Sequence, residues 1–298
     1  MKKIISAAVT PFTSDNKIDL KSAANLYEFG LTCGLDGFFI LGSMGEWALL
    51  TDEEKTALAG CACDVIGDRA DILLGISDTG LPNILRNMEQ LSHLKHSHWT
   101  VILPGGWPGP ACPVKYLHRI ADEADRPLYY YHIPPFNGVN ISTEQFGDIL
   151  AHPKIVGIKN SAGSIRLRKE LLFLKKTVDF KLFEGEEWSI DEALIGGCDG
   201  AVAGFGSVGA KLMKTIARHV EEGQIESAKE CQFKLIEIFH GVYGGAHAPW
   251  WNVGQKYALE YMGIISSTVS RIDDQQTLPE DRKAAIRACI DTNRDYIL

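Results

Sequence analysis

The stretch that decides the fold runs from Pro127 to Asn160 and reads PLYYYHIPPFNGVNISTEQFGDILAHPKIVGIKN. It opens with an apolar run, 127–131, that has the length of a buried parallel strand. An amphipathic segment, 143–151, follows Ser142, a residue that favours the start of a helix. A second apolar run, 155–158, closes the stretch. This order predicts a strand, a helix and a second strand parallel to the first.

The same alternation covers most of the chain. Short apolar runs lie at 4–9, 37–41, 72–76, 100–103, 127–131, 155–158, 181–183 and 200–203, and helical patterns lie at 20–33, 53–66, 82–95, 113–124, 143–151, 165–177, 188–196 and 207–222. Strand–helix units in this number predict a (β/α)₈ TIM barrel of the α/β class. A doubly wound open sheet is the alternative, and the absence of a G-x-G-x-x-G turn after the first run disfavours it.

The strand pattern stops after about residue 223. Helical patterns continue at 225–243, 250–262 and 279–295. We therefore predict a catalytic barrel over residues 1–223 and a C-terminal helical appendage over residues 224–298.

Composition limits the classes of function. The 298 residues are 45% hydrophobic and 23% charged, which allows a large core. A formal net charge of −8 argues against a nucleic-acid partner, because phosphates call for clustered Lys and Arg. No run reaches the roughly 18 apolar residues of a membrane span. The seven cysteines are odd in number and match no zinc spacing, so we expect a cytoplasmic protein with free thiols.

Lys159 directly follows the apolar run 155–158, at the end of a strand where barrel enzymes place their chemistry. Partial desolvation at such a position favours the neutral amine, which can attack a carbonyl carbon and form a Schiff base. The alternative for Lys159 is an ion pair with a carboxylate at the barrel rim.

Tyr131 ends the preceding apolar run, 28 residues before Lys159, so the two side chains are expected side by side. A phenol beside an amine can relay protons during carbinolamine formation and carbon–carbon cleavage. The alternative is packing, since tyrosines at 129–131 form a run. Only alternate residues of a strand share a face, so Tyr129 and Tyr131 should point one way and Tyr130 the other.

The turn Gly42-Ser43-Met44-Gly45-Glu46 follows the second strand. Consecutive amides between glycines can bind a carboxylate, although an ordinary turn is the alternative. His93, His96 and His98 precede the fourth strand, at the barrel end opposite to the chemistry. We therefore expect no metal site there, and no organic cofactor.

Six segments lie in order along the chain and resemble those of one family. They are Thr10-Pro11-Phe12, Gly42-Ser43-Met44-Gly45-Glu46, Tyr131-His132-Ile133-Pro134, Gly157-Ile158-Lys159-Asn160-Ser161, Gly185-Glu186-Glu187 and Asn252-Val253-Gly254-Gln255-Lys256-Tyr257-Ala258-Leu259. The chain resembles the N-acetylneuraminate lyase and dihydrodipicolinate synthase superfamily of Schiff-base class I aldolases. The likeness extends over the whole chain, and it is specific for the superfamily but not for one substrate.

The resemblance implies a role for each matching residue. Lys159 would be the Schiff-base lysine, Tyr131 the general acid and base, and Ser43 the hydroxyl between that tyrosine and the substrate. The turn at Ser43 and Met44, with the backbone of Val202, would bind the carboxylate of a 2-oxo acid. The family also implies a homo-oligomer, a tetramer or a dimer.

Several positions depart from the family pattern. Met44 replaces a second hydroxyl residue in the turn. Trp107 lies in a stretch, 104–108, where many members carry a tyrosine that reaches into a partner subunit. Phe136 stands where synthases of lysine biosynthesis carry an arginine, so we do not expect this chain to synthesise dihydrodipicolinate. Glu187, in the loop 185–188, stands where sialate lyases bind sugar hydroxyls, although Trp188 replaces their next acidic residue.

These features predict a lyase that cleaves a 2-oxo-3-deoxy sugar acid, or a sialic-acid-like relative, to pyruvate and an aldehyde. We expect Gly185, Glu187, Trp107 and Phe136 to surround the distal part of the substrate. The first alternative is a Schiff-base hydro-lyase of a 2-oxo sugar acid. A dihydrodipicolinate synthase and a barrel that binds a small acid without catalysis are further alternatives.

Overall fold

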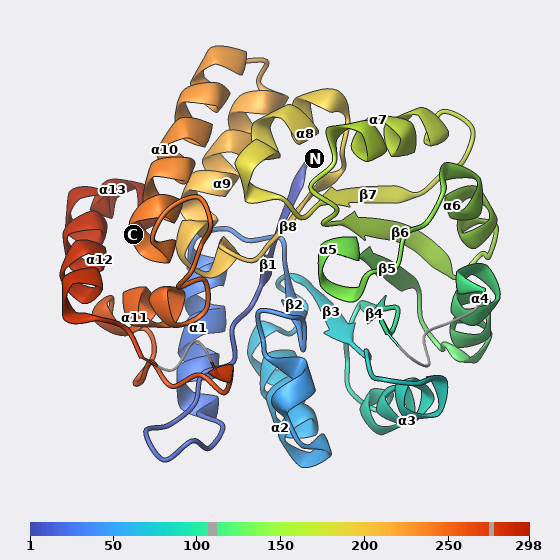
Figure 1. Cartoon of the computed structure of the whole chain (residues 1–298), viewed down its shortest axis with the longest axis horizontal. Helices are drawn as coiled ribbons and strands as arrows, with labels where there is room; N and C mark the ends of the chain where they lie inside the picture. Colours follow the sequence, from blue (N-terminus) through green and yellow to red (C-terminus); the bar gives the residue numbers. More distant parts are fainter. Residues whose placement is uncertain (107–111, 274–276) are drawn as a thin grey trace.

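The strands of this chain close into a parallel barrel, in a computed structural model that describes residues 1–106, 112–273 and 277–298. Each strand pairs with the next along the chain, and β8 pairs with β1 (Figure 1). The strands are β1 (Lys3–Ala7), β2 (Gly37–Ile40), β3 (Asp71–Gly75), β4 (His98–Ile102), β5 (Leu128–His132), β6 (Ile155–Asn160), β7 (Lys181–Glu184) and β8 (Gly200–Ala203). The predicted (β/α)₈ barrel is confirmed.

Helices surround the barrel and continue beyond it. They are α1 (Leu20–Thr32), α2 (Asp52–Ile66), α3 (Leu81–Leu91), α4 (Pro113–Glu123), α5 (Pro134–Asn137), α6 (Thr143–Leu150), α7 (Ile165–Leu174), α8 (Ile190–Gly196), α9 (Gly206–Glu221), α10 (Ile225–Tyr243), α11 (Val253–Tyr261), α12 (Glu280–Thr292) and α13 (Arg294–Ile297), with short 3₁₀ turns η1 (Trp47–Leu49) and η2 (Glu187–Ser189). The periodicity of the sequence did not predict the single-turn segments α5 and η1, because they are too short to show a repeat, whereas the predicted helix 188–196 includes most of η2 together with α8.

Local capping explains where several helices begin. Thr51 and Glu54 form a reciprocal capping box at the start of α2, and Ser142 and Gln145 do the same for α6. Asp19 caps α1 by accepting a hydrogen bond from the amide of Ser22. These bonds satisfy amides that have no partner within the helix itself.

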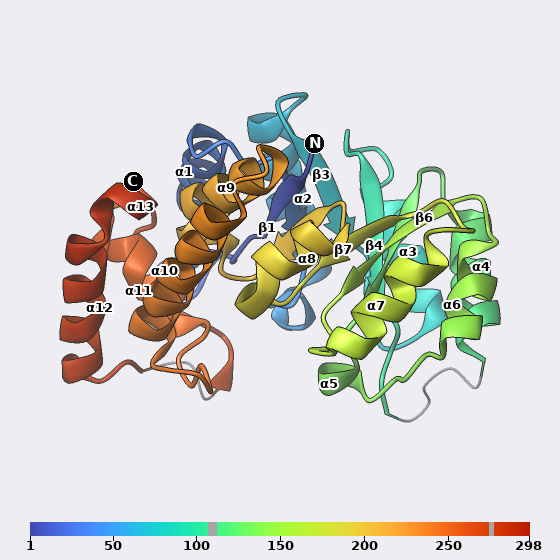
Figure 2. The same cartoon turned by 90° about the horizontal axis from the view of Figure 1, so that it is seen from above.

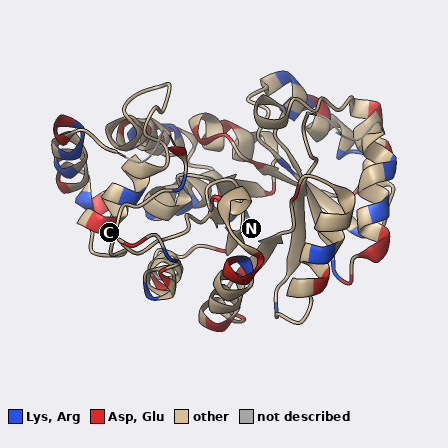
Figure 3. Cartoon of the chain, turned by 60° about the horizontal axis from the view of Figure 1, so that its bottom comes forward, with Lys and Arg blue, Asp and Glu red and all other residues tan. Residues whose placement is uncertain are grey.

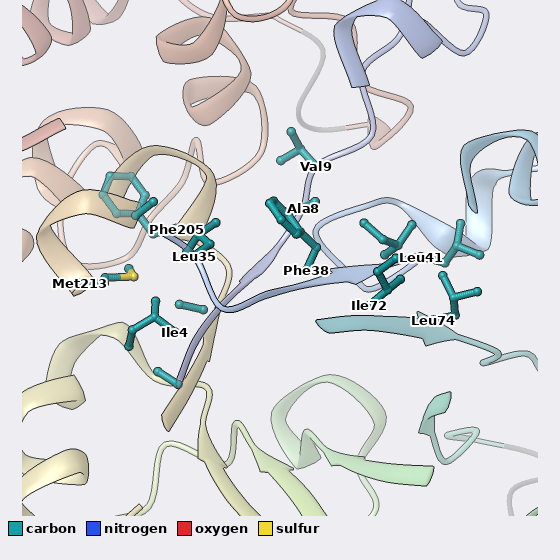
Figure 4. Packing of buried hydrophobic residues seen from close by; sticks show 14 of the residues in the cluster. Ile4, Ala8, Val9, Leu35, Phe38, Leu41, Ile72, Leu74, Phe205 and Met213 are labelled. Carbon is teal, nitrogen blue, oxygen red and sulfur yellow. The ribbon is translucent and has the colours of Figure 1, made fainter. Parts of the chain in front are cut away.

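Two layers of buried side chains hold the barrel together. The inner layer fills the barrel and joins Ile5, Ala7, Phe39, Leu73, Ile102, Tyr129, Tyr131, Phe183 and Val202. The outer layer lies between strands and helices; Figure 4 shows part of it, with Ile4, Phe38 and Ile72 on the strands and Phe205 and Met213 beside them. Strand alternation sends side chains to the two layers in turn.

The helices α10 to α13 lie on one side of the barrel, beside α9 and α1 (Figures 1 and 2). Their buried residues, among them Leu235, Leu259 and Ile286, belong to the same continuous hydrophobic cluster as the outer layer of the barrel. The division at residue 223 therefore stays a prediction, since packing is continuous across it.

Along the outer helices, Lys and Arg are interspersed with Asp and Glu (Figure 3). Among the residues that the structure describes, no helix is both long enough and apolar enough to cross a membrane.

Candidate active site

Tyr131 and Lys159 are direct neighbours across the β5–β6 pair, where their backbones are in register. The ammonium nitrogen of Lys159 lies 3.8 Å from the centroid of the Tyr131 ring and 5.1 Å from that of Phe39. Tyr129 and Tyr131 belong to the inner layer and Tyr130 to the outer layer, as strand alternation predicts. The side-by-side placement expected from the 28-residue spacing is therefore present.

Lys159 is buried without a counter-charge. Its side chain belongs to a residue that is 5% exposed, and its Nζ makes no ion pair or hydrogen bond within the described parts of the chain. Buried lysines are usually paired with a carboxylate. The rim ion pair considered as the alternative is not formed with any described residue, and the rings of Phe39 and Tyr131, whose faces attract a cation, lie near the amine instead. Within the described residues, the amine is therefore not held by an ion pair or a hydrogen bond.

The turn after β2 has its backbone arranged for an anion. The amides of Gly45 and Glu46 are used inside the turn, where they donate to the carbonyls of Gly42 and Ser43. The amides of Ser43 and Met44 make no hydrogen bond among the described residues, and the Ser43 hydroxyl is buried without a partner there. Such unsatisfied donors in a concave turn fit a carboxylate. No hydrogen bond joins Ser43 to Tyr131 in this part of the structure.

Three strand ends converge beside this turn. A Cβ added at Gly204, which directly follows β8, would lie 3.1 Å from the Met44 sulfur and 3.1 Å from Oε1 of Glu187. Val202, two residues earlier, is fully buried in the inner layer. The turn after β2, the loop after β7 and the end of β8 therefore share one wall of the barrel mouth.

The loop after β7 is tied to its surroundings. Gly185 lies so close to the loop after β6 that an added Cβ would approach Oγ of Ser161 to 2.0 Å, so a side chain there would force Ser161 to shift. Oε1 of Glu187 accepts a hydrogen bond from the amide of Phe205, 2.9 Å away, which precedes α9. Glu187 therefore anchors the start of α9 rather than capping its own short helix.

Glu186, the neighbour of Glu187, has an unusual environment. Burial, together with the nearby carboxylates Glu187 and Glu184, raises the pKa of the Glu186 carboxyl to about 7. Glu184 itself is paired with Arg168, whose guanidinium nitrogen lies 3.1 Å from it. The loop thus contains a carboxyl group that changes charge near neutral pH.

A cleft of about 330 Å³ opens beside the ends of β4 and β5. Its wall includes Ile102 of the inner layer, the aromatic rings of Trp47 and Phe136, and the polar residues Asp78 and Asn137. Phe136 is 69% exposed. None of the described residues that line the cleft is Lys or Arg. Trp107, expected at this end, lies outside the described residues.

The three histidines lie at the opposite end of the barrel. Nδ1 of His96 contacts the carbonyl of Leu94 at 2.9 Å, and its ring packs against Trp99. Burial lowers the pKa of His96 to about 4. The His98 ring packs against Tyr129. These contacts are those of packed structural histidines.

Sequence reasoning missed residues whose neighbours only the fold reveals. Phe39 and Phe183 flank Lys159 from β2 and β7. Glu46 was quoted as part of a turn, but its buried ion pair with Lys256, a residue far away in the sequence, was not foreseen. Phe39 and Phe183 lie in apolar runs, and the alternation of side chains along a strand could have placed them inside the barrel. No local pattern joins Glu46 to Lys256.

Comparison with known proteins fits this geometry. The sequence model of the Dihydrodipicolinate synthetase family matches residues 1–291. The chain belongs to this family. Its members are Schiff-base-forming, pyruvate-dependent lyases and aldolases, so the chain is an enzyme of that type.

Relatives within the family are distant but collinear. A 4-hydroxy-tetrahydrodipicolinate synthase of Kineococcus radiotolerans is 26% identical over 286 residues, which cover 93% of this chain and 89% of the relative. A 4-hydroxy-tetrahydrodipicolinate synthase of Stenotrophomonas maltophilia is 28% identical over 265 residues, covering 88% and 86%.

Solved structures of the family superimpose closely. A prophage protein of the dihydrodipicolinic acid synthase family from E. coli K12, in complex with pyruvate, has a TM-score of 0.89 at 25% identity and covers 99% of each chain. A monomeric dihydrodipicolinate synthase variant has a TM-score of 0.90 at 21% identity, covering 99% of this chain and 97% of the variant, which supports the fold alone.

Proposed function

We propose that this member of the family cleaves a 2-oxo-3-deoxy sugar acid, or a related polyol-bearing 2-oxo acid, to pyruvate and an aldehyde, with Lys159 as the Schiff-base residue. The observation that carries the proposal is the unpaired amine of Lys159, buried 3.8 Å from the centroid of the Tyr131 ring. The E. coli K12 relative in complex with pyruvate supports the choice of a 2-oxo acid.

The proposed reaction needs only side chains of this chain. The neutral amine of Lys159 adds to the C2 carbonyl, and loss of water gives a protonated imine. Tyr131 removes the proton of the C4 hydroxyl while the C3–C4 bond breaks. The electron pair of the broken C3–C4 bond moves into the imine and gives an enamine. Protonation at C3 and hydrolysis then release pyruvate and free Lys159. The imine serves as the electron sink, so the mechanism requires no metal or organic cofactor.

In this proposal the substrate carboxylate binds the free amides of Ser43 and Met44 beside Val202. The buried hydroxyl of Ser43 supplies a third donor. Because Met44 brings no side-chain hydroxyl, the backbone carries more of this contact than in members with two hydroxyl residues.

The distal part of the substrate extends, in this proposal, into the cleft lined by Trp47, Asp78, Phe136 and Asn137. Aromatic faces and hydrogen-bonding groups suit a neutral polyol. The lack of Lys or Arg among the described lining residues disfavours a second carboxylate, as in aspartate semialdehyde. Glu187 would accept hydrogen bonds from hydroxyl groups with the capacity that its bond to Phe205 leaves free.

The test of the nucleophile is covalent trapping. Incubation with pyruvate and borohydride should add a reduced pyruvyl group to the peptide that carries Lys159. Lys159→Arg should abolish both trapping and turnover, because a guanidinium group stays protonated. Trapping on another lysine, or none in the wild-type enzyme, would refute the assignment.

The substrate class is tested with a panel of 2-oxo acids. We expect pyruvate release from 2-oxo-3-deoxy sugar acids. Consumption of such an acid without release of pyruvate, but with formation of a dehydrated 2-oxo product, would instead establish the hydro-lyase alternative.

A further inference from the structure

A buried ion pair connects the C-terminal region to the turn that holds Ser43 and Met44. Lys256 of α11 pairs with Glu46, and both side chains are 0% exposed. The second carboxylate oxygen of Glu46 accepts hydrogen bonds from the amide of Arg271 at 2.6 Å and from the hydroxyl of Ser270 at 3.2 Å. Two segments that are more than 200 residues from Glu46 in the sequence therefore satisfy its carboxylate.

Further bonds from the same region reach the mouth of the barrel. Nδ2 of Asn252 donates to the carbonyl of Met44 at 3.4 Å, and Nε2 of Gln255 donates to the carbonyl of Gly204 at 3.1 Å. Tyr243 orients Gln255 by donating to its side-chain oxygen at 2.7 Å. Residues 252–256 thus contact the two backbone segments, after β2 and after β8, that lie against the proposed carboxylate position.

The turn needs such support. Glu46 has a φ of 56°, in the left-handed region that residues other than glycine rarely adopt. A non-glycine residue stays in that conformation when its surroundings hold it, and such residues often occur at ligand clamps. On its other side, the hydroxyl of Thr10 donates to the carbonyl of Gly45 at 2.6 Å.

We propose that the buried pair Glu46–Lys256 is a positioning device for the carboxylate subsite, which holds the amides of Ser43 and Met44 toward the 2-oxo acid. This inference rests on the proposed function, because it takes the carboxylate to bind at those amides. It makes residues 252–271 a support for the turn that binds the substrate carboxylate. Lys256 and Glu46 act through the turn and do not touch the substrate.

Glu46→Gln is the informative variant. The amide oxygen of glutamine still accepts from Ser270 and Arg271, while the charge is lost. Burial already lowers the pKa of Lys256 to about 8, and Glu46 opposes that shift, so loss of the carboxylate lowers the pKa of Lys256 further and favours its neutral form. No unpaired buried charge remains, and the variant is expected to fold.

The measurement compares two ligands that differ only in the carboxylate. Borohydride trapping at Lys159 is followed as a function of the concentration of pyruvate and of pyruvamide. We expect Glu46→Gln to weaken pyruvate trapping by about tenfold or more, the scale of one charge-assisted hydrogen bond, and to leave pyruvamide trapping nearly unchanged. The double variant Glu46→Gln/Lys256→Met should show the same loss as Glu46→Gln, since both variants break one device.

Asp36→Asn is the matched control. Asp36 stands at the other end of β2 and is likewise bonded to a lysine, Lys214, and to a backbone amide, that of Ile4, each at 2.7 Å. Its ratio of pyruvate to pyruvamide trapping should equal that of the wild type, whatever the change in melting temperature.

Each outcome decides the inference. A ratio of pyruvate to pyruvamide trapping in Glu46→Gln equal to that of the wild type, including equal losses with both ligands, would overturn the inference. The proposed function would stand in that case, as long as pyruvate is trapped at Lys159 of the wild type. Unfolding of both Glu46 variants beside a folded Asp36→Asn would make the pair a folding element and also overturn it. A wild-type enzyme that pyruvate does not label at Lys159 would refute the proposed function itself.

Discussion

Two tyrosines on one strand differ in their neighbours. Tyr131 contacts the amine of Lys159 and packs edge-on against Phe39 with 5.8 Å between ring centroids. Tyr129 lies two residues earlier on β5, in the same inner layer, where it packs against Phe183 and His98. Burial raises the pKa of the Tyr129 hydroxyl, so it is a poor proton donor or acceptor at neutral pH. The proposed proton relay therefore belongs to Tyr131 alone.

This contrast predicts the effects of removing each hydroxyl. Tyr131→Phe keeps the ring contacts and should lower kcat by about 10²–10⁴-fold, the usual contribution of general acid–base catalysis. Tyr129→Phe, its matched control, should keep kcat close to that of the wild type. Pyruvate formation measured at saturating substrate checks both, and equal losses in the two variants would contradict the proton-relay role.

At the scale of elements, the loop after β7 contacts the start of α9, and in the proposed function it also contacts the substrate. Glu187 accepts a hydrogen bond from the amide of Phe205, close to the positive end of the α9 dipole. Glu186 lies beside Glu184 and Glu187, and only Arg168 offsets their charges among the groups that shift its pKa. If the loop binds the substrate as proposed, a change at Glu187 should alter both substrate affinity and stability.

Glu187→Ala should affect both properties. Loss of the bond to Phe205 is expected to cost roughly 1–2 kcal/mol of unfolding free energy, measured by urea denaturation. KM for a polyol-bearing 2-oxo acid should rise well above any change in pyruvate exchange. Glu187→Gln keeps an acceptor for Phe205 and should retain most of the stability. Equal effects on the two ligands would mean that Glu187 only anchors α9.

The raised pKa of Glu186 predicts that the stability of the protein depends on pH. Its folded pKa of about 7 lies above the ordinary value of 4.5, so folding retains a proton that the unfolded chain releases. The stability associated with the protonated form is complete below about pH 4.5 and is lost as pH rises to 7 and beyond. Glu186→Gln should therefore melt at a higher temperature than the wild type at pH 8 and at nearly the same temperature at pH 5. If the difference in melting temperature between Glu186→Gln and the wild type did not grow with pH, the raised pKa of Glu186 would be refuted.

At the scale of the whole molecule, family membership and the shape of the mouth set different limits on the substrate. The family establishes Schiff-base chemistry, and its curated relatives are named 4-hydroxy-tetrahydrodipicolinate synthases. In this chain, the cleft beside β4 and β5 presents Phe136 and Trp47 and, among its described lining residues, no Lys or Arg. Family membership thus establishes the type of reaction, and in the proposed function the residues at the mouth select the aldehyde.

We therefore expect negligible condensation of pyruvate with aspartate semialdehyde. The carboxylate of that aldehyde would meet no cation in the cleft. The assay follows loss of pyruvate in the presence of aspartate semialdehyde, with pyruvate trapping at Lys159 as the control for an active preparation. Robust condensation would show that another cation performs the role of the family's arginine.

The sequence by itself determined the fold and the pair of residues at its centre. Strands and helices in regular alternation can close only a few architectures, and the spacing of Tyr131 and Lys159 equals one repeat, so parallel register brings them together. It also indicated that Tyr129 and Tyr131 face the interior, because alternation is a local property of any strand.

Only the tertiary structure decided which partners the charged groups have. Lys159 and Lys256 are both buried lysines, yet one lies among aromatic rings without an ion pair in the described chain and the other is paired with Glu46. Likewise, Glu187 bonds to Phe205 rather than to its own helix. The physical reason is that an ion pair or a hydrogen bond depends on distances of a few ångströms between segments far apart in sequence. Local patterns specify which elements form, whereas barrel closure and the docking of α11 set those distances.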